Sequence, residues 1–500
     1  MSLSAAYNII SSSFAANAAQ TSVVSKNIAN ANTPGYSREI PNVLTNLYGG
    51  AEVDSITREA NSALMEQASD STSQAASQQA IADGLTKLAQ TVSDSASATS
   101  ASGATQNGAS PSAMLANLQN ALQTYAASPG NASVGQAAVG AASSLAASLN
   151  SASATVQQVR SQADSNIASS VASINSLLGQ FSKANNAIVM GLQTGADMSS
   201  AMDNRDTILG QLSQQIGIST VGNPDGSTSI YTDSGVTLFQ TTPRTVAFAP
   251  TQALTAGASG NSVTVDGVPI TGPGAPMAVH SGALAGLASL RDTIAPTYQS
   301  QLDQIAKGLV DAFAETDQSA TPTLPALPGL FTYPGATGLP LAANVSGLAG
   351  KIQINRNVDP AQGGNLNLLR DGGISSPGNP AYSYNGSGAA GFTGRIQQLI
   401  GQISATQSFD PAAGLPASSS LVTYSSGSVS WVQGQNQQAS DQVSYQNALA
   451  TQATSALSNA TGVNLDAEMT HMLNLENSYT ATAKLLTTVN AMFTALMNAA

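Results

Sequence analysis

The sequence predicts a mainly α-helical protein with a β-rich outer domain. The terminal helices are expected to form a coiled-coil core, followed by a long helical bundle or rod and an inserted antiparallel β domain. Three observations support this fold class. Both ends carry apolar heptad repeats, residues 133–193 keep helical apolar spacing, and the middle shows β-branched alternation around Asp-Gly turns.

The N-terminal segment has a heptad seam in which apolar positions alternate by four and three residues. Asn17 and Thr21 are its polar members. The seam consists of Leu3, Tyr7, Ile10, Phe14, Asn17, Thr21, Val24 and Ile28.

The C-terminal segment repeats the pattern, with Glu468 and Thr482 as interruptions. Its seam consists of Leu465, Met472, Leu475, Tyr479, Leu486, Val489, Phe493 and Leu496. Two interpretations stay open. The end helices pair to close one domain, or they also dock onto similar helices of other copies.

Between these ends, the first half is helical. Residues 81–92 carry one apolar face, and a second helix begins at Ser110 as N-cap with Pro111 at its first position. Residues 133–193 contain no proline and predict one helix of ~90 Å. Gly135, Gly140 and Gly179 are the positions where it would bend or break. The pattern favours a rod-like hairpin or bundle.

Residues 217–280 predict a small antiparallel β domain, with turns at Asn-Pro-Asp-Gly and Asp-Gly. Helix returns over residues 281–318, with a kink expected near Pro296. The Gly- and Pro-rich residues 319–390 predict loops around short strands, including "KIQIN". From residue 391 the chain is helical again, broken near 408–420 and at Thr461-Gly462.

This order predicts three domains, each built from segments that are distant in sequence. The coiled-coil core takes residues 1–45 and 460–500. The rod takes 46–216, 281–318 and 421–459. The outer domain takes 217–280 and 319–420.

The composition excludes several classes of function. Charged residues make up 8% and the net charge is −12, so neither nucleic acid nor an anionic membrane is an expected partner. The chain has no cysteine, and no run of 18 apolar residues predicts a transmembrane helix. The first charge is Lys26, which does not fit a cleaved secretory signal.

Catalytic and metal-binding patterns are missing. His280 and His471 are far apart in sequence. Asp203, Arg205 and Asp206 are either a carboxylate pair for acid–base chemistry or, the favoured interpretation, a local ion pair at a helix start. We therefore expect no enzyme activity, no cofactor and no metal.

The stretch "SKNIANANTPGYSREI", residues 25–40, follows the N-terminal seam. Its asparagines, Asn27, Asn30 and Asn32, are suited to hydrogen-bond backbone groups at a helix C-terminus. Pro34 biases Thr33 away from helical geometry, so the helix is expected to stop here and a linker to begin. A capped helix end and a joint that contacts neighbouring subunits are both compatible with these residues.

Two of these stretches resemble motifs of a known family. "SKNIANANTPGYSRE" resembles the N-terminal motif of the flagellar rod, hook and hook-associated proteins, and "GVNLDAEMTHMLNLENSYTATAKLLTTVNAMFTALMNA" resembles their C-terminal motif. "TPGYSR" and "MDNRDTILGQLSQQIGI" are most similar to the hook-associated protein 1 branch. The resemblance covers residues 1–320 and 391–500, whereas 320–390 departs from it.

The resemblance implies a structural subunit of the junction between hook and filament, with an alternative as another axial protein such as a hook, rod or flagellin-like subunit. It implies an extracellular flagellar location after type III export without a cleaved signal. The implied partners are hook protein, hook-associated protein 3, a cytosolic export chaperone bound to the C-terminal helix, and further copies in a ring of roughly eleven. The implied assembly motif is Asn27, Ile28, Ala29, Asn30, Asn32, Thr33, Pro34, Gly35, Tyr36, Ser37 and Arg38.

Overall fold

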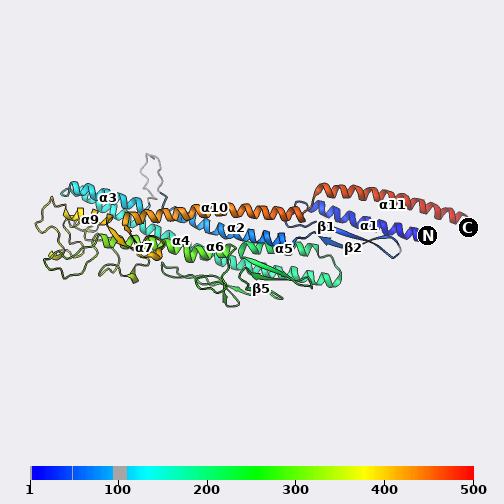
Figure 1. Ribbon diagram of the computed structural model, residues 1–500, viewed down its shortest axis with the longest axis horizontal. Helices are drawn as coiled ribbons and strands as arrows, with labels where there is room; N and C mark the ends of the chain where they lie inside the picture. The colour runs from blue at the N-terminus through cyan, green and yellow to red at the C-terminus, as the bar shows by residue number, and fades with distance from the viewer. Residues whose placement is uncertain (1–2, 48, 94–109, 500) are drawn as a thin grey trace.

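The computed structural model describes residues 3–47, 49–93 and 110–499 and shows an elongated molecule (Figure 1). The two chain ends lie next to each other at one end of the long axis, and loops form the opposite end. Helices dominate, and the sheets are small and antiparallel, so the predicted fold class is confirmed. Among the described residues, no helix is both long and apolar enough to cross a bilayer.

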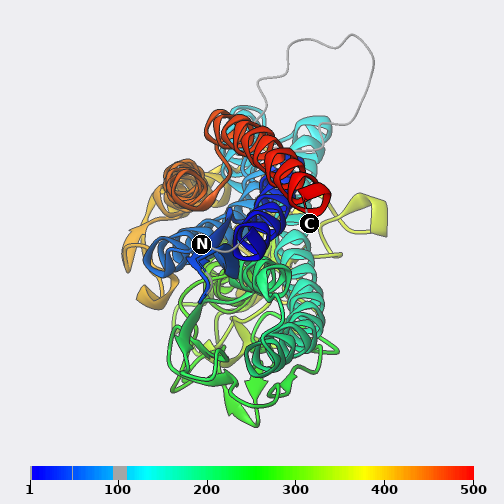
Figure 2. The same ribbon diagram turned by 90° about the vertical axis from the view of Figure 1, so that its right-hand side faces the viewer.

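One end of the molecule is formed by α1 (Leu3–Asn30) and α11 (Leu465–Ala499), which pack side by side (Figures 1 and 2). A hairpin of β1 (Glu39–Thr45) and β2 (Ala51–Arg58) lies against α1. We call these four elements the terminal unit.

The hairpin was not predicted from sequence, which assigned residues 39–45 to the coiled-coil core domain and 46–58 to the helical rod. Pro41 within β1 and a bulge between Asn42 and Val43 disrupt the alternation by which a strand is recognised. A sheet of two strands tolerates both features because each strand has a free edge.

The rod is built around α4 (Ala132–Thr194), an unbroken helix of 63 residues, about 95 Å long. The single long helix is confirmed, and the suggested breaks at its glycines are wrong. Gly135 instead lets the ring of Tyr125 approach, since a Cβ there would lie 3.0 Å from that ring. The helix ends at Gly195, whose φ of 72° suits glycine.

Seven further segments complete the rod around α4. They are α2 (Ser62–Ala89), α3 (Pro111–Ala127), α5 (Ser199–Gln215), α6 (Ala283–Ser289), the π-helical η1 (Leu290–Ile294), α7 (Ala295–Ala312) and α10 (Leu421–Thr461). The predicted cap of α3 is confirmed, because the Ser110 hydroxyl accepts from the amide of Ala113. α10 packs along α2, as Figure 1 shows.

The kink expected near Pro296 takes the form of the π-helical turn directly before it. Proline has no N–H to donate to the carbonyl four residues earlier, and the wider turn of η1 accommodates the missing bond. The chain therefore continues from α6 into α7 without a break.

The middle strands form two small sheets. The first contains β3 (Ile218–Gly222), β4 (Thr228–Thr232) and β5 (Thr237–Phe239), and the second contains β6 (Val246–Ala247), β7 (Thr264–Val265) and β8 (Val268–Pro269). The predicted Asp266-Gly267 turn is confirmed, with positive φ at both residues. Phe239 packs edge-on against Phe181 of α4 at 4.9 Å, so the strands share the core of the rod.

The far end is mostly loop, as residues 319–390 predicted. It contains β9 (Phe331–Thr332), β10 (Gln353–Ile354), α8 (Leu368–Asp371), α9 (Gly394–Ser404), β11 (Thr406–Ser408), β12 (Ser418–Ser420) and short 3₁₀ turns at 342–344, 360–362, 380–382 and 411–413. The expected strand in "KIQIN" is β10.

A continuous apolar core links these parts of the rod. It extends from Ala80 to Ala439 and includes side chains of the middle sheets and the far end. Among the described residues, none from the terminal unit belongs to it. The terminal unit and the rod are therefore two separately packed regions.

Candidate functional site

The end helices meet along the predicted seams, but with unequal burial. Phe14 packs edge-on against Tyr479 at 5.0 Å, and Tyr7 against Phe493 at 6.5 Å. The buried seam residues are Ile10, Asn17, Val24, Glu468, Leu475, Thr482 and Val489. The others are partly covered or exposed. The half-buried ones are Leu3, Phe14, Thr21, Ile28, Met472, Leu486 and Phe493, and the exposed ones are Tyr7, Leu465, Tyr479 and Leu496.

α11 also exposes apolar side chains that the sequence seam did not include: Met469, Leu473, Leu485, Met492 and Met497. α1 covers only one side of α11, so two helices cannot enclose all of its apolar residues. Large exposed apolar surfaces on a helix mark contacts with other chains. The terminal unit thus presents more apolar surface than one copy buries.

The centre of the predicted motif is Asn27, which is 1% exposed. Its amide nitrogen donates to the Glu39 carbonyl at 2.9 Å and to a Glu468 carboxylate oxygen at 3.2 Å. Its carbonyl oxygen accepts from the Tyr36 hydroxyl at 2.8 Å and the Glu39 amide at 3.0 Å. Both donors and both acceptor positions are used, which no other side chain of this size can reproduce.

Glu468 connects this cluster to the C-terminal helix. Its carboxylate is 1% exposed and accepts from the Arg38 guanidinium at 2.7 Å. The Arg38 amide donates to the carbonyl of Thr461, where α10 ends. Burial, followed by the charges of Glu39 and its acidic neighbours, raises the pKa of the Tyr36 phenol, so the hydroxyl stays a donor. We call Asn27, Tyr36, Arg38, Glu39 and Glu468 the Asn27 cluster.

The remaining motif residues form the turn that ends α1. The Asn30 side chain donates to the Lys26 carbonyl, the backbone contact predicted for this asparagine. Gly35 has a φ of 81°, and a Cβ there would lie 2.5 Å from the Thr207 hydroxyl of α5. Ala29, Asn32, Thr33 and Pro34 are exposed. Asn27 also hydrogen-bonds backbone groups, but they belong to Glu39 of β1 and not to the helix C-terminus that was expected.

A second polar cluster joins the terminal unit to the rod. Arg58, at the end of β2, forms ion pairs with Asp203 at 3.5 Å and with Asp206, both on α5. The Ser37 amide donates to Asp203 at 3.3 Å. The local ion pair favoured from sequence is therefore incomplete, because the main cation comes from a strand that was not predicted. We call Arg58, Asp203, Asp206 and the Ser37 amide the Arg58 latch.

Asp203 is a weaker acid than an ordinary aspartate. Burial raises its pKa to about 6, against the attraction of Arg58, which lowers it. A groove of about 1740 Å³ runs beside the latch, lined by the turn after α1, β2, α5 and the end of α10. The terminal unit and the rod are thus connected by charged groups next to an open space.

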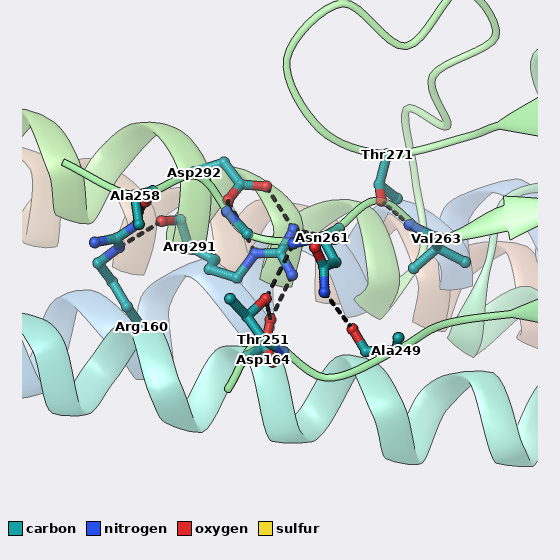
Figure 3. A network of polar contacts seen from close by, with 11 residues as sticks. Arg160, Asp164, Ala249, Thr251, Ala258, Asn261, Val263, Thr271, Arg291 and Asp292 are labelled. Carbon is teal, nitrogen blue, oxygen red and sulfur yellow. Dashed lines mark hydrogen bonds and ion pairs between the residues drawn. The ribbon is translucent and has the colours of Figure 1, made fainter. Parts of the chain in front are cut away.

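A third polar cluster lies inside the rod (Figure 3). The Arg291 guanidinium is fully buried and donates to Asp164 at 2.6 Å, to both oxygens of Asp292, and to the Asn261 carbonyl. The carboxylates of Asp292 and Asp164 raise its pKa, although burial alone would lower it. We call Arg291, Asp164 and Asp292 the Arg291 clamp.

Arg160 extends this cluster to the loop between β6 and β7. It donates to the carbonyls of Arg291, Thr255 and Ala258. The backbone of Gly260 lies directly against the Arg291 guanidinium. A Cβ at this position would be 2.2 Å from the central guanidinium carbon, so the site requires glycine. The clamp fixes the loop to α4 and was not predicted, because Asp164 is distant in sequence from Arg291 and Asp292 and the three follow no motif.

Three family models match the chain. Residues 101–322 match the flagellar hook-associated protein FlgK helical domain, 6–36 the flagella basal body rod protein, and 455–499 the flagellar basal body rod FlgEFG protein C-terminal. The long match falls on the rod, and the two short matches fall on α1 and on α11 with the end of α10. No curated protein sequence matches the chain.

Among solved structures, the flagellar hook junction protein FlgK from Burkholderia pseudomallei is similar, at 22% identity and a TM-score of 0.41. The similarity covers 54% of this chain and 46% of that chain, so less than half of that protein's length is spanned. The three family models together match more than half of the residues, in the order and at the places that the sequence motifs indicated. The chain is thus similar to the FlgK helical domain over residues 101–322 and to flagellar rod proteins at both ends, which together indicate a structural subunit of the flagellar axis.

Proposed function

We propose that this chain is a non-catalytic structural subunit of the junction between the flagellar hook and filament. The observation that carries the proposal is the terminal unit, which exposes apolar residues on both sides of α11 and lies outside the core of the rod. Burying such an apolar surface against further copies of the chain would stabilise the assembly. The sparse charge of the chain, 8% of its residues, keeps repulsion between copies small.

The partners follow from this role and from the family. Further copies, roughly eleven in a ring, would pack through α1 and α11. Hook protein would lie on one side of the layer and hook-associated protein 3 on the other. Export would run through the type III apparatus, with a cytosolic chaperone covering the apolar residues of α11 beforehand, and would deliver the subunit to the extracellular flagellum.

A deletion strain tests the junction role. Cells without this protein are expected to build hooks, fail to attach filaments and release flagellin into the medium. Hookless cells would point to another axial role, and normal filaments would exclude both. Complementation with the unaltered gene is the control that ties the phenotype to this chain.

A second experiment tests the assembly motif within the same strain. Asn27→Ala removes four hydrogen bonds and is expected to reduce filament attachment strongly. The matched control is Asn32→Ala, at an exposed position of the same turn, which is expected to leave attachment near the wild-type level. Equal effects of both changes would contradict the role assigned to Asn27.

A further inference from the structure

The connection between the terminal unit and the rod differs from the packing inside either region. The chain crosses it in two short segments, at residues 59–61 and 462–464. The directional contacts across it are polar: Arg58 with Asp203 and Asp206, the Ser37 amide with Asp203, the Arg38 amide with the Thr461 carbonyl, and Lys26 with Asp197 at 3.8 Å. The continuous apolar core does not extend across it.

We propose that the Arg58 latch is a conformational lock that holds the terminal unit at one angle to the rod, and that the unit pivots about the two connecting segments when the latch opens. Polar contacts are suited to this task because water replaces them when they separate, whereas an apolar interface would resist separation over its whole area. The groove of about 1740 Å³ beside the latch provides the space for the movement.

Not every buried nitrogen of the latch and its neighbourhood forms a hydrogen bond, which distinguishes the latch from a fixed structural ion pair. The Arg58 Nε lies 3.5 Å from an Asp203 oxygen and the neighbouring Arg205 Nε lies 4.0 Å from an Asp206 oxygen, and neither buried nitrogen forms a hydrogen bond. Buried polar atoms without partners destabilise the state that contains them. The closed angle therefore carries a cost that opening to water removes.

The raised pKa of Asp203 predicts how the latch responds to pH. The groups that face Asp203 are Arg58 from β2, Asp206 from its own helix, Glu39 from β1, and the Ser37 amide and Tyr36 from the turn after α1. Burial outweighs the attraction of Arg58, so the pKa is about 6 in the closed state and returns towards its ordinary value of 3.8 when opening exposes the carboxyl. Proton uptake between these two values favours the closed state.

Distance measurements on the full chain test this inference without any flagellar assembly. The natural sequence has no cysteine, so Gln438→Cys on α10 and Asn490→Cys on α11 place two spin labels at exposed positions, one on each side of the connection. Pulsed electron resonance at pH 7.5 is expected to give one main distance with a minor open population. One molar salt is expected to increase the open population, since it screens the latch.

Arg58→Ala is expected to raise the open population about tenfold, the response to losing one charged hydrogen bond. The matched control is Arg244→Ala, which removes an exposed ion pair with Asp266 far from the connection and leaves the distances unchanged. Circular dichroism confirms that each variant is folded.

Lowering the pH from 7.5 to 5 is expected to reduce the open population of the unaltered latch. Asp203→Asn keeps an acceptor for the Ser37 amide and is expected to abolish this pH response. An unchanged distance distribution in Arg58→Ala, or an open population that grows in acid, would overturn the inference. Because the measurement uses the isolated chain, failure of the junction role leaves its outcome unaffected.

Discussion

Two buried arginines in this molecule have similar partners and different surroundings. Arg291 lies inside the rod, fully buried, with its guanidinium bonded to two aspartates and a backbone carbonyl. Arg58 lies between the terminal unit and the rod, with a side chain that is 10% exposed and an Nε that pairs with Asp203 at 3.5 Å without a hydrogen bond. A groove borders Arg58, whereas apolar side chains surround the elements that hold Arg291.

The difference shows that the contribution of an ion pair to stability depends on its surroundings. Within a packed core, breaking the pair would leave a charge that no water can reach, so the pair holds its neighbours in one arrangement. Beside a groove, the same pair can exchange its partners for water at a modest cost. The first arrangement fixes the outer loop to α4, and the second suits a connection that adjusts.

The largest effect is expected from breaking the Arg291 clamp. Arg291→Ala leaves Asp164 and Asp292 buried without their cation and should lower the free energy of unfolding by about 3–5 kcal/mol. Urea denaturation followed by circular dichroism measures it. Arg244→Ala, which breaks an exposed pair, should cost less than about 1 kcal/mol. Equal costs for the two variants would refute the contrast between buried and exposed pairs.

A pH titration sharpens the comparison within the rod. Burial raises the pKa of Asp303 to about 6, although the Ala349 and Gly347 amides lower it. Because the folded pKa lies above the ordinary value, Asp303 favours folding most at about pH 4, and this contribution is lost as the pH rises through 6. The difference in the free energy of unfolding between the unaltered protein and Asp303→Asn should therefore change by at most about 3 kcal/mol between pH 4 and 7. A difference that stays constant over this range would disprove the assigned pKa.

Much of the rod was predictable from sequence, since α4 and α3 follow apolar periodicity and standard caps. The ends were predictable for the same reason, because heptads predict pairing. The β1–β2 hairpin was not predictable, because Pro41 and the bulge interrupt the alternation of apolar and polar residues by which a strand is recognised. The Arg58 latch and the Arg291 clamp depend on contacts between residues more than a hundred positions apart, which no local pattern encodes.

An intermediate effect is expected at the Asn27 cluster. Asn27→Ala leaves the Glu39 amide and one Glu468 carboxylate oxygen without their hydrogen bonds to Asn27 and should lower the free energy of opening α1 by about 1–3 kcal/mol. The unfolding of the rod should stay unchanged, because the terminal unit lies outside its core. Hydrogen exchange of α1 and α4 peptides separates the two effects. A loss of protection in α4 as large as that in α1 would be inconsistent with separate packing.

The smallest effect is expected in the seam of the end helices. The buried Asn17 side chain donates to the exposed Ser478 hydroxyl at 3.1 Å, a polar pair at the edge of the seam. Replacing both, with Asn17→Val and Ser478→Ala, should be neutral or stabilise the pair by up to about 1 kcal/mol, since no unpaired polar group remains. Asn17→Val alone is the control, and it should be less favourable. A double variant less stable than the single one would show that the polar pair stabilises the seam.

The central claim is that the terminal unit and the rod are separately packed and joined by a polar latch. Native-state hydrogen exchange of the full chain in increasing urea tests it most directly. The account predicts that amides of α1 and α11 exchange through an opening that leaves α4 protected, and that Arg58→Ala promotes this opening alone. Exchange of α1, α11 and α4 in a single cooperative unfolding event would contradict it.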